Sequence, residues 1–192
     1  VARPGARPAP GNSALEKKQL TADELRFSFQ SQGQSLQNAE TAGPGKLVVT
    51  PSDAKVGTRV ITAGQFLMAF DGRNRLETLR GESGTRVVFQ PPKNAPPGSI
   101  AQESSAEHLE AGFDTALQTV RTVRQWGNFQ FREGDRQGTA DLASYDAETE
   151  SVILTGRPEL RDPDMRTRAE RVVIDLRDDS AEGTGKVQST HL

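Results

Sequence analysis

Apolar and polar residues alternate along most of this chain, a pattern typical of β-strands with one buried face. The alternation is clearest in Leu-x-Phe-x-Phe from Leu25 and in Phe-x-Met-x-Phe from Phe66. Such segments recur between short turn-forming stretches, and no segment shows a helical period of ordinary length. The pattern therefore predicts an all-β, mainly antiparallel protein with about ten or more short strands.

The predicted strands belong to a repeated unit. Each copy begins with an alanine, has apolar residues at the third and fifth positions after it, and usually closes on an aspartate before a polar turn. About five hairpin-like copies are recognisable, and they begin at Ala22, Ala63, Ala106, Ala140 and Ala169. The closing residues are Gln30 in the first copy and then Asp71, Asp114, Asp146 and Asp175. Because the spacing is irregular, the repeat favours stacked hairpins with variable turns over a solenoid with fixed coils.

Two stretches interrupt this organisation. The first of residues 1–18 are mostly Pro, Ala, Gly and Arg, and this segment is predicted to be a disordered linker. One β-domain is predicted to follow over residues 19–192. Residues 90–101 carry several prolines, which cannot pair inside a sheet. They predict a loop between two copies of the repeat.

In every copy the apolar residues share one face of the strand. The residues expected on this face, and therefore the candidate binding residues, are Phe27, Phe29, Phe66, Met68, Phe70, Leu109, Phe113, Tyr145, Val172 and Ile174. If the strands stack in register, these side chains form one stripe inside a curved sheet or flattened barrel. The interior is then either a closed, dry core or a partly open apolar trough, and alternation alone does not separate the two.

Composition removes several classes of function. The formal net charge is -2, with basic and acidic residues interspersed, so no field attracts nucleic acid. The absence of cysteine excludes a disulfide framework, thiolate zinc sites and a cysteine nucleophile, and it fits cytosol and periplasm equally well. No apolar run approaches the roughly 18 residues that a membrane-spanning helix needs.

Few residues suggest catalysis or metal binding. The recurring aspartates each stand where a strand enters a turn, and an aspartate there hydrogen-bonds its own backbone. Asp162-Pro163-Asp164 is expected to be a turn for the same reason. A Ser-His-Asp triad through His108 has no supporting nucleophile motif, and two histidines are too few for a histidine metal cluster. We therefore expect no catalytic residue, no metal and no cofactor. Trp126 is expected to cap the core, with the mouth of a groove as the alternative.

One stretch, residues 138–190, carries a more specific pattern. It combines an Ala-led strand closing on Tyr145-Asp146, the run Val-Ile-Leu-Thr-Gly from Val152, the pair Arg157-Pro158, a second strand from Ala169 to Asp175, and a Gly-x-Val close at Gly185. In these features the chain resembles the OstA-like domain of bacterial lipopolysaccharide transport proteins, the group of LptA, LptC and the periplasmic part of LptD. The same pattern is weaker but repeated from Thr21 onward.

The resemblance implies a slightly open, stacked antiparallel β-jellyroll whose apolar interior holds the acyl chains of lipid A. It implies a non-enzymatic periplasmic protein, anchored if at all through a segment outside this sequence, that binds lipopolysaccharide or a related glycolipid and relays it to the outer membrane. Its expected partners are other lipopolysaccharide transport proteins, docked through edge strands, and further copies of itself joined end to end.

Two alternatives stay open at this stage. The chain could instead be a β-repeat scaffold that assembles through its edge strands without a ligand. Five arginines are concentrated in the last third of the chain, namely Arg157, Arg161, Arg166, Arg168 and Arg171. We expect them on a solvent-exposed face; the alternative is that they bind lipid phosphates.

Overall fold

The computed structural model describes residues 16–30, 35–178 and 180–191. Over these residues all regular structure is β, with 16 strands joined in one continuous antiparallel sheet. The prediction of an all-β, stacked antiparallel jellyroll is confirmed. Most of the expected linker, residues 1–15, lies outside the described residues, and the first strand begins at Lys17.

The strands are short at both ends of the chain and long in the middle. The first eight are β1 (Lys17–Ala22), β2 (Leu25–Phe29), β3 (Leu36–Thr41), β4 (Gly45–Thr50), β5 (Thr58–Phe70), β6 (Leu76–Gln90), β7 (Gln102–Ala106) and β8 (His108–Phe113). The others are β9 (Val120–Glu133), β10 (Arg136–Asp146), β11 (Ser151–Thr155), β12 (Glu159–Arg161), β13 (Met165–Arg168), β14 (Arg171–Asp175), β15 (Ser180–Thr184) and β16 (Gln188–His191).

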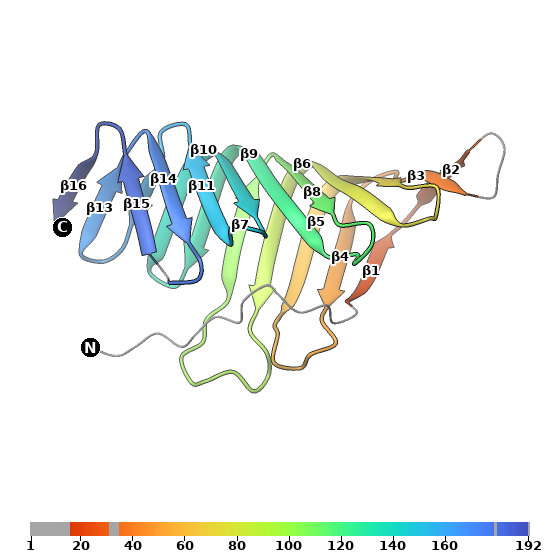
Figure 1. The fold of residues 1–192 in the computed structure, drawn as a ribbon, viewed down its shortest axis with the longest axis horizontal. Coiled ribbons are helices and arrows are strands. Elements are labelled where there is room, and N and C mark those ends of the chain that lie inside the picture. Colours follow the sequence, from red (N-terminus) through yellow and green to blue (C-terminus); the bar gives the residue numbers. More distant parts are fainter. Residues whose placement is uncertain (1–15, 31–34, 179, 192) are drawn as a thin grey trace.

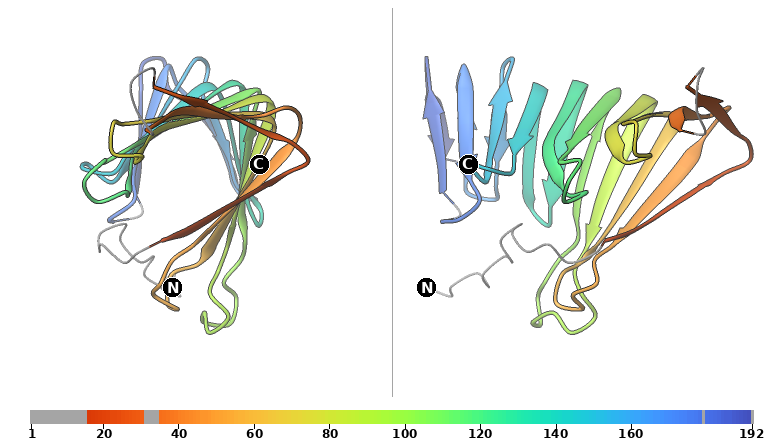
Figure 2. Two further views of the ribbon diagram at one scale, coloured as in Figure 1. Left: turned by 90° about the vertical axis from the view of Figure 1, so that its right-hand side faces the viewer. Right: turned by 45° about the vertical axis from the view of Figure 1, so that its right-hand side comes forward.

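The sheet folds along one line into two layers. Layer A consists, in order of pairing, of β1, β4, the first half of β5, the second half of β6, β7, the second half of β9, the first half of β10, β12, β13 and β16. Layer B consists of β2, β3, the second half of β5, the first half of β6, β8, the first half of β9, the second half of β10, β11, β14 and β15. The strands stack from β1 and β2 at one end to β15 and β16 at the other (Figure 1). Seen along the stack, the two layers form a C-shaped profile (Figure 2, left).

The chain passes between the layers at a corner that repeats one arrangement. The alanines that open the repeat lie at this corner, and four of them are buried, namely Ala63, Ala106, Ala140 and Ala169. In three copies the residue after the alanine donates its backbone N–H to the carbonyl oxygen of a glycine in, or just after, the neighbouring strand. These hydrogen bonds join Glu107 to Gly127 (2.8 Å), Asp141 to Gly156 (2.9 Å) and Glu170 to Gly185 (2.8 Å).

Gly156 shows why the corner needs glycine. Its φ is +73°, and a Cβ at this position would lie 2.5 Å from the Cβ of Asp141. The next residue, Arg157, also has a positive φ of 56° and forms an ion pair with Asp141 at 3.2 Å. The backbone therefore approaches so closely here that only a residue without a side chain fits.

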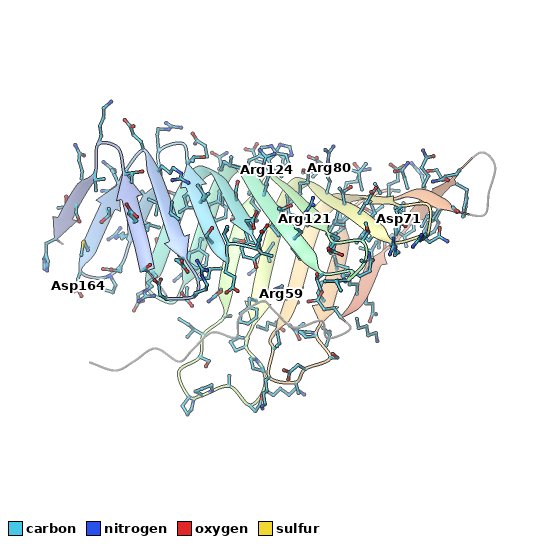
Figure 3. All side chains as sticks on the ribbon, in the orientation of Figure 1. Arg59, Asp71, Arg80, Arg121, Arg124 and Asp164 are labelled. Atoms are coloured by element: carbon cyan, nitrogen blue, oxygen red, sulfur yellow. The ribbon has the colours of Figure 1, made fainter. Side chains whose placement is uncertain are left out.

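The aspartates of the repeat turn the chain at the other end of layer B. Asp71 accepts hydrogen bonds from the backbone N–H groups of Arg73 and Arg75, both at 2.9 Å (Figure 3). Asp114 accepts them from Leu117 and Ala116, both at 2.8 Å. Asp146 and Asp175 make the same kind of bond. The prediction that these aspartates are turn residues is confirmed, as it is for Asp162, which accepts from the backbone of Asp164 and Met165.

The corner geometry predicts unequal effects of adding one methyl group at two glycines. Gly156→Ala should lower the free energy of unfolding by about 1–3 kcal/mol, because it adds both a clash and a left-handed backbone penalty. Gly72→Ala is the control, since a Cβ at Gly72 meets nothing within 4 Å. Its effect should stay within about 0.5 kcal/mol. Urea unfolding followed by circular dichroism measures both, and equal losses would contradict the proposed role of the corner.

The turn aspartates predict a loss of stability in acid. The backbone N–H groups of Leu117 and Ala116 hold the pKa of Asp114 below its usual 3.8. Because its pKa is lowered on folding, Asp114 stabilises the fold above the unfolded-state value, and this contribution disappears as the pH falls through the folded-state pKa. Asp114→Asn keeps an acceptor oxygen but does not titrate, so its unfolding free energy should fall less steeply with acidification than that of the wild type.

Asp164→Asn serves as the matched control. Asp164 is exposed (Figure 3), and in its turn it donates its backbone N–H to the side chain of Asp162. Urea midpoints at neutral pH and near pH 3.8 compare the three proteins. An Asp114→Asn profile parallel to the wild type would show that this turn does not contribute to acid sensitivity.

Candidate functional site

The inner face of layer B carries an unbroken row of apolar side chains along the whole stack. Each member pairs directly with the next across adjacent strands, so the row follows from the register of the sheet. This middle row consists of Phe27, Ala39, Met68, Leu79, Ala111, Val123, Tyr145, Val152, Ile174 and Ala181. Most of its larger members between the two end strands, such as Met68 and Ile174, are only half-buried.

A second row lies nearer the corner, and it is closed. This corner row runs through Phe66, Gly81, Leu109, Gln125, Ala143, Leu154, Val172 and Gly183. Its large members, Phe66, Leu109, Leu154 and Val172, are at most 2 % exposed. Gly81, Ala143 and Gly183 leave room for the large residues of this row, and a Cβ on Gly81 would already lie 2.9 Å from the side chain of Thr85. The corner row is therefore packed core.

A third set lies toward the turns, farther from the corner. This rim set contains Phe29, Leu36, Phe70, Leu76, Phe113 and Val120. Phe70 is half-buried against the core, whereas Phe113 is 7 % exposed.

The ten candidate binding residues are thus divided among three environments. Phe66, Leu109, Phe113 and Val172 are buried. Met68, Phe70, Tyr145 and Ile174 are half-buried. Phe27 and Phe29 are 56 % and 61 % exposed, because β2 is an end strand that pairs only with β3. The sequence pattern placed all ten on one stripe; the structure gives them different access to solvent.

The inner face of layer A, opposite these rows, changes from apolar to more polar along the stack. The inner row of layer A begins with Leu20, Leu47, Ile61 and Val87 and continues with Ser104, Phe131, Gly138, Leu160, Thr167 and Ser189. The first four pack in one hydrophobic cluster with Phe66 and Leu109. The interior is therefore more apolar at the β1 end than at the β16 end.

One buried polar residue in this interior was missed by the sequence interpretation. Gln125 is 7 % exposed and lies in the corner row between Leu109 and Ala143. Its Oε1 accepts a hydrogen bond from Ser104 of layer A at 2.8 Å, and its Nε2 has no hydrogen-bond partner among the described residues. A search for apolar periodicity passes over a glutamine, although its position in the alternation of β9 places it on the inner face.

Charged residues also reach the inner face near β1. Lys18 and Arg59 belong to one inward-facing row, separated by Val49. The Lys18 ammonium donates to the backbone oxygen of Gln118 at 2.8 Å, and the Glu16 carboxylate lies 3.5 Å from Lys18 and 3.7 Å from Arg59. The sequence pattern gave no signal for this cluster, because it depends on which strands lie opposite one another.

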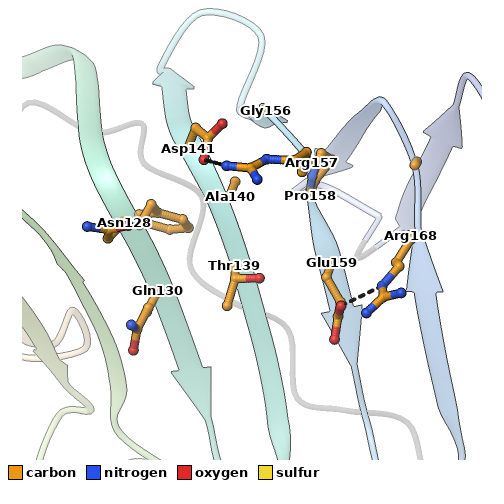
Figure 4. Close-up of a pocket in the computed structure, with 12 residues that line it drawn as sticks. Asn128, Gln130, Thr139, Ala140, Asp141, Gly156, Arg157, Pro158, Glu159 and Arg168 are labelled. Carbon is orange, nitrogen blue, oxygen red and sulfur yellow. Dashed lines mark hydrogen bonds and ion pairs between the residues drawn. The ribbon is translucent and has the colours of Figure 1, made fainter.

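A depression of about 550 Å³ lies outside, where the corner meets layer A (Figure 4). Its charged side chains are paired: Arg157 with Asp141, and Arg168 with Glu159 at 2.8 Å. Arg166 also binds Glu159, and hydrogen bonds from Arg166 and Arg168 lower the pKa of that carboxyl. These arginines lie on the outer face, as expected for a solvated surface.

Trp126 and His108 lie on the outer face of layer B. The prediction that Trp126 caps the core is wrong, because the register pairs it with His108 and Leu142, whose side chains point away from the interior. The two rings stack with centroids 5.2 Å apart, and His108 Nδ1 contacts the carboxylate of Glu82. Arg124 packs over the Trp126 ring at 5.8 Å (Figure 3).

The described residues offer neither a metal site nor a membrane-spanning helix. Within residues 16–30, 35–178 and 180–191, no three or more His, Asp or Glu side chains are placed to hold a metal ion. The same part of the chain contains no helix that is long and apolar enough to cross a membrane.

Comparison with known proteins identifies the family of this chain. The family described as "LptA/(LptD N-terminal domain) LPS transport protein" matches residues 16–180. The chain belongs to this lipopolysaccharide transport family. The match confirms the resemblance seen in residues 138–190 and extends it over most of the chain.

Two other comparisons add little to the family match. Curated proteins gave no match. Among solved structures, the chain is similar to LptH from Pseudomonas aeruginosa, described as the LptA homologous periplasmic component of the lipopolysaccharide transport device. The identity is 10 %, covering 91 % of this chain and 94 % of that chain, with a TM-score of 0.37, which is too low to carry an argument.

The rows predict different costs for truncating two phenylalanines. Phe66→Ala should lower the free energy of unfolding by about 3–5 kcal/mol, because it opens a cavity in a closed core. Phe27→Ala, at a side chain that is 56 % exposed, should cost well under half as much. Thermal and urea unfolding compare the two. Similar losses would show that the interior is uniformly packed from corner to end strand.

Proposed function

We propose that this family member binds the acyl chains of lipopolysaccharide or a related glycolipid along the inner face of layer B and relays them across the periplasm to the outer membrane. The observation that supports this most directly is the middle row, which is continuous from β2 to β15. The corner row forms a closed core that stabilises the fold. The half-buried members of the middle row supply apolar surface that a lipid can cover.

The energetics suit a carrier without specific polar contacts to the chains. Each methylene group removed from water contributes roughly 0.8 kcal/mol, so several acyl chains together bind through burial alone. Because successive positions along the row are chemically alike, a chain can shift from one strand to the next at little cost. Transport in this proposal is passive and non-enzymatic, driven by loading at one end.

The ends of the stack are the proposed contact surfaces for other transport proteins. Among the described strands, β1 pairs only with β4 and β2 only with β3 at one end; at the other, β15 pairs only with β14 and β16 only with β13. Such edges present unpaired backbone groups that accept another strand. Docking of another lipopolysaccharide transport protein, or of a second copy, would continue both layers and the middle row.

Adjacent residues on opposite faces test acyl-chain binding. A photo-crosslinking amino acid at Met68 or Ile174 samples the inner face, and the same replacement at Leu67 or Val173 samples the outer face; all four side chains are half-buried. After irradiation of the purified protein with lipopolysaccharide, we expect adducts at Met68 and Ile174 and none at Leu67 and Val173.

A folded protein with no adduct at the inner positions would overturn the proposal. The open edge strands would then favour the scaffold alternative, which predicts concentration-dependent assembly in the absence of lipid. Adducts at Met68 alone would restrict binding to the β1 end and would contradict relay along the whole row.

A further inference from the structure

Two cations and one carboxylate meet inside the rim at the β1 end. Lys18 lies on β1 and Arg59 on β5, and both occupy the inward-facing row that also contains Val49 and Phe89. Glu16, just before β1, lies between the two cations. Charge placed in a largely apolar interior is costly unless it is paired and hydrogen-bonded.

Lys18 reaches across the interior from one layer to the other. Its ammonium group donates to the backbone oxygen of Gln118, in the turn that follows β8, and lies 5.5 Å from the ring centroid of Phe113 in layer B. An ammonium group has three donors, and this hydrogen bond uses one of them. The Lys18 side chain is 20 % exposed, so the group is sheltered but reachable from the rim.

Arg59 presents its guanidinium to the same space. It packs over the ring of Phe89 at 5.9 Å, and its side chain is 39 % exposed. Among the described residues its only ionic partner is Glu16. Its positive charge is also felt by Tyr145 on the opposite layer, where burial raises the pKa of the phenol and Arg59 partly opposes that rise.

Glu16 offsets only one of the two positive charges and forms no good hydrogen bond with either cation. Its oxygens lie 3.5 Å from Lys18 and 3.7 Å from Arg59, which is ion-pair range but too long for good hydrogen bonds. Glu16 Oε2 is buried and has no hydrogen-bond partner among the described residues. A single carboxylate can therefore contact both cations, but it leaves hydrogen-bonding capacity unused on each side.

We propose that Lys18 and Arg59 form a site for a phosphate group of the bound lipid. In the absence of lipid, the Glu16 carboxylate occupies this site. This inference rests on the proposed function, since it places the anionic head of the same lipid at the rim and its acyl chains on the apolar rows beyond. A phosphate has more acceptor oxygens than a carboxylate and matches the planar donor fork of arginine, so it satisfies donors that Glu16 does not.

The location suits an amphipathic ligand. Phe113 lies against Lys18 and Phe89 against Arg59, so apolar surface begins directly beside the charges. The arginines of the last third offer a poorer site, because Arg157, Arg166 and Arg168 are already bound to carboxylates on the outer face.

The test compares two lipids that differ only in phosphate. Lipid A and enzymatically dephosphorylated lipid A are titrated against the purified chain and against the Lys18→Gln/Arg59→Gln double variant. We expect the double variant to bind lipid A about tenfold more weakly, a loss of ~1.4 kcal/mol, and to bind the dephosphorylated lipid within about twofold of the wild type. Lys17→Gln/Lys46→Gln is the control, because it removes two charges from the outward-facing positions of β1 and β4; both affinities should remain unchanged.

Different failures have different meanings. If the wild type binds both lipids equally and the double variant changes neither, the phosphate site is wrong while acyl-chain binding stands. If the wild type binds neither lipid, the proposed function fails with it. If the double variant loses both lipids equally, Lys18 and Arg59 hold the layers together rather than bind phosphate, and the inference is overturned.

Two further measurements test competition by Glu16 and binding of free phosphate. Glu16→Gln removes the competing carboxylate and should tighten lipid A binding about threefold, since an uncharged amide no longer competes for the cations; Glu77→Gln, an exposed site, is its control. Inorganic phosphate alone should bind at least a hundredfold more weakly than lipid A, because it lacks the buried chains. Tight binding of inorganic phosphate that the double variant abolishes would reassign the site to free phosphate.

Discussion

The close backbone approach at the corner is the constraint on which the rest of this structure depends. A glycine on one strand accepts a hydrogen bond from the residue after a buried alanine on the next, and this contact recurs at Gly127, Gly156 and Gly185. Because the glycine has no side chain to meet that of the donor residue, adjacent strands turn from one layer into the other at the same level. The contact thereby aligns the strands of the last three copies, and the inner rows there follow from that alignment.

Alignment of the strands produces an interior with graded access. Side chains beside the corner, such as Phe66 and Val172, are enclosed by both layers and stabilise the fold. Several side chains farther out, such as Met68 and Ile174, stay half-buried, whereas Phe113 near the turns is buried. One sheet thus combines a packed core with exposed apolar surface, which is the combination that a lipid carrier needs and that a closed sandwich lacks.

Two of the polar features in this interior differ in kind. Gln125 is enclosed and joined to Ser104, so it links the layers at the boundary between the two hydrophobic clusters. Lys18 and Arg59 lie at the rim, where solvent and a ligand head group can reach them. The two features differ in their access to solvent. The enclosed amide of Gln125 stabilises the fold, whereas the partly exposed cations are suited to binding.

The sequence by itself determined the strands, the faces and the turns. Period-two alternation predicted an all-β fold, the recurring alanines marked the start of each copy, and Asp71 and Asp114 marked the turns, because each of these signals is local in the chain. The family pattern around Tyr145 and Gly156 was local in the same way. Only the tertiary structure decided that Phe27 is exposed on an end strand, that Trp126 faces outward, and that Lys18 crosses to the turn after β8. Alternation shows that a strand has two different faces, but how far each face is covered depends on strands that are distant in sequence, and only the folded sheet brings those together.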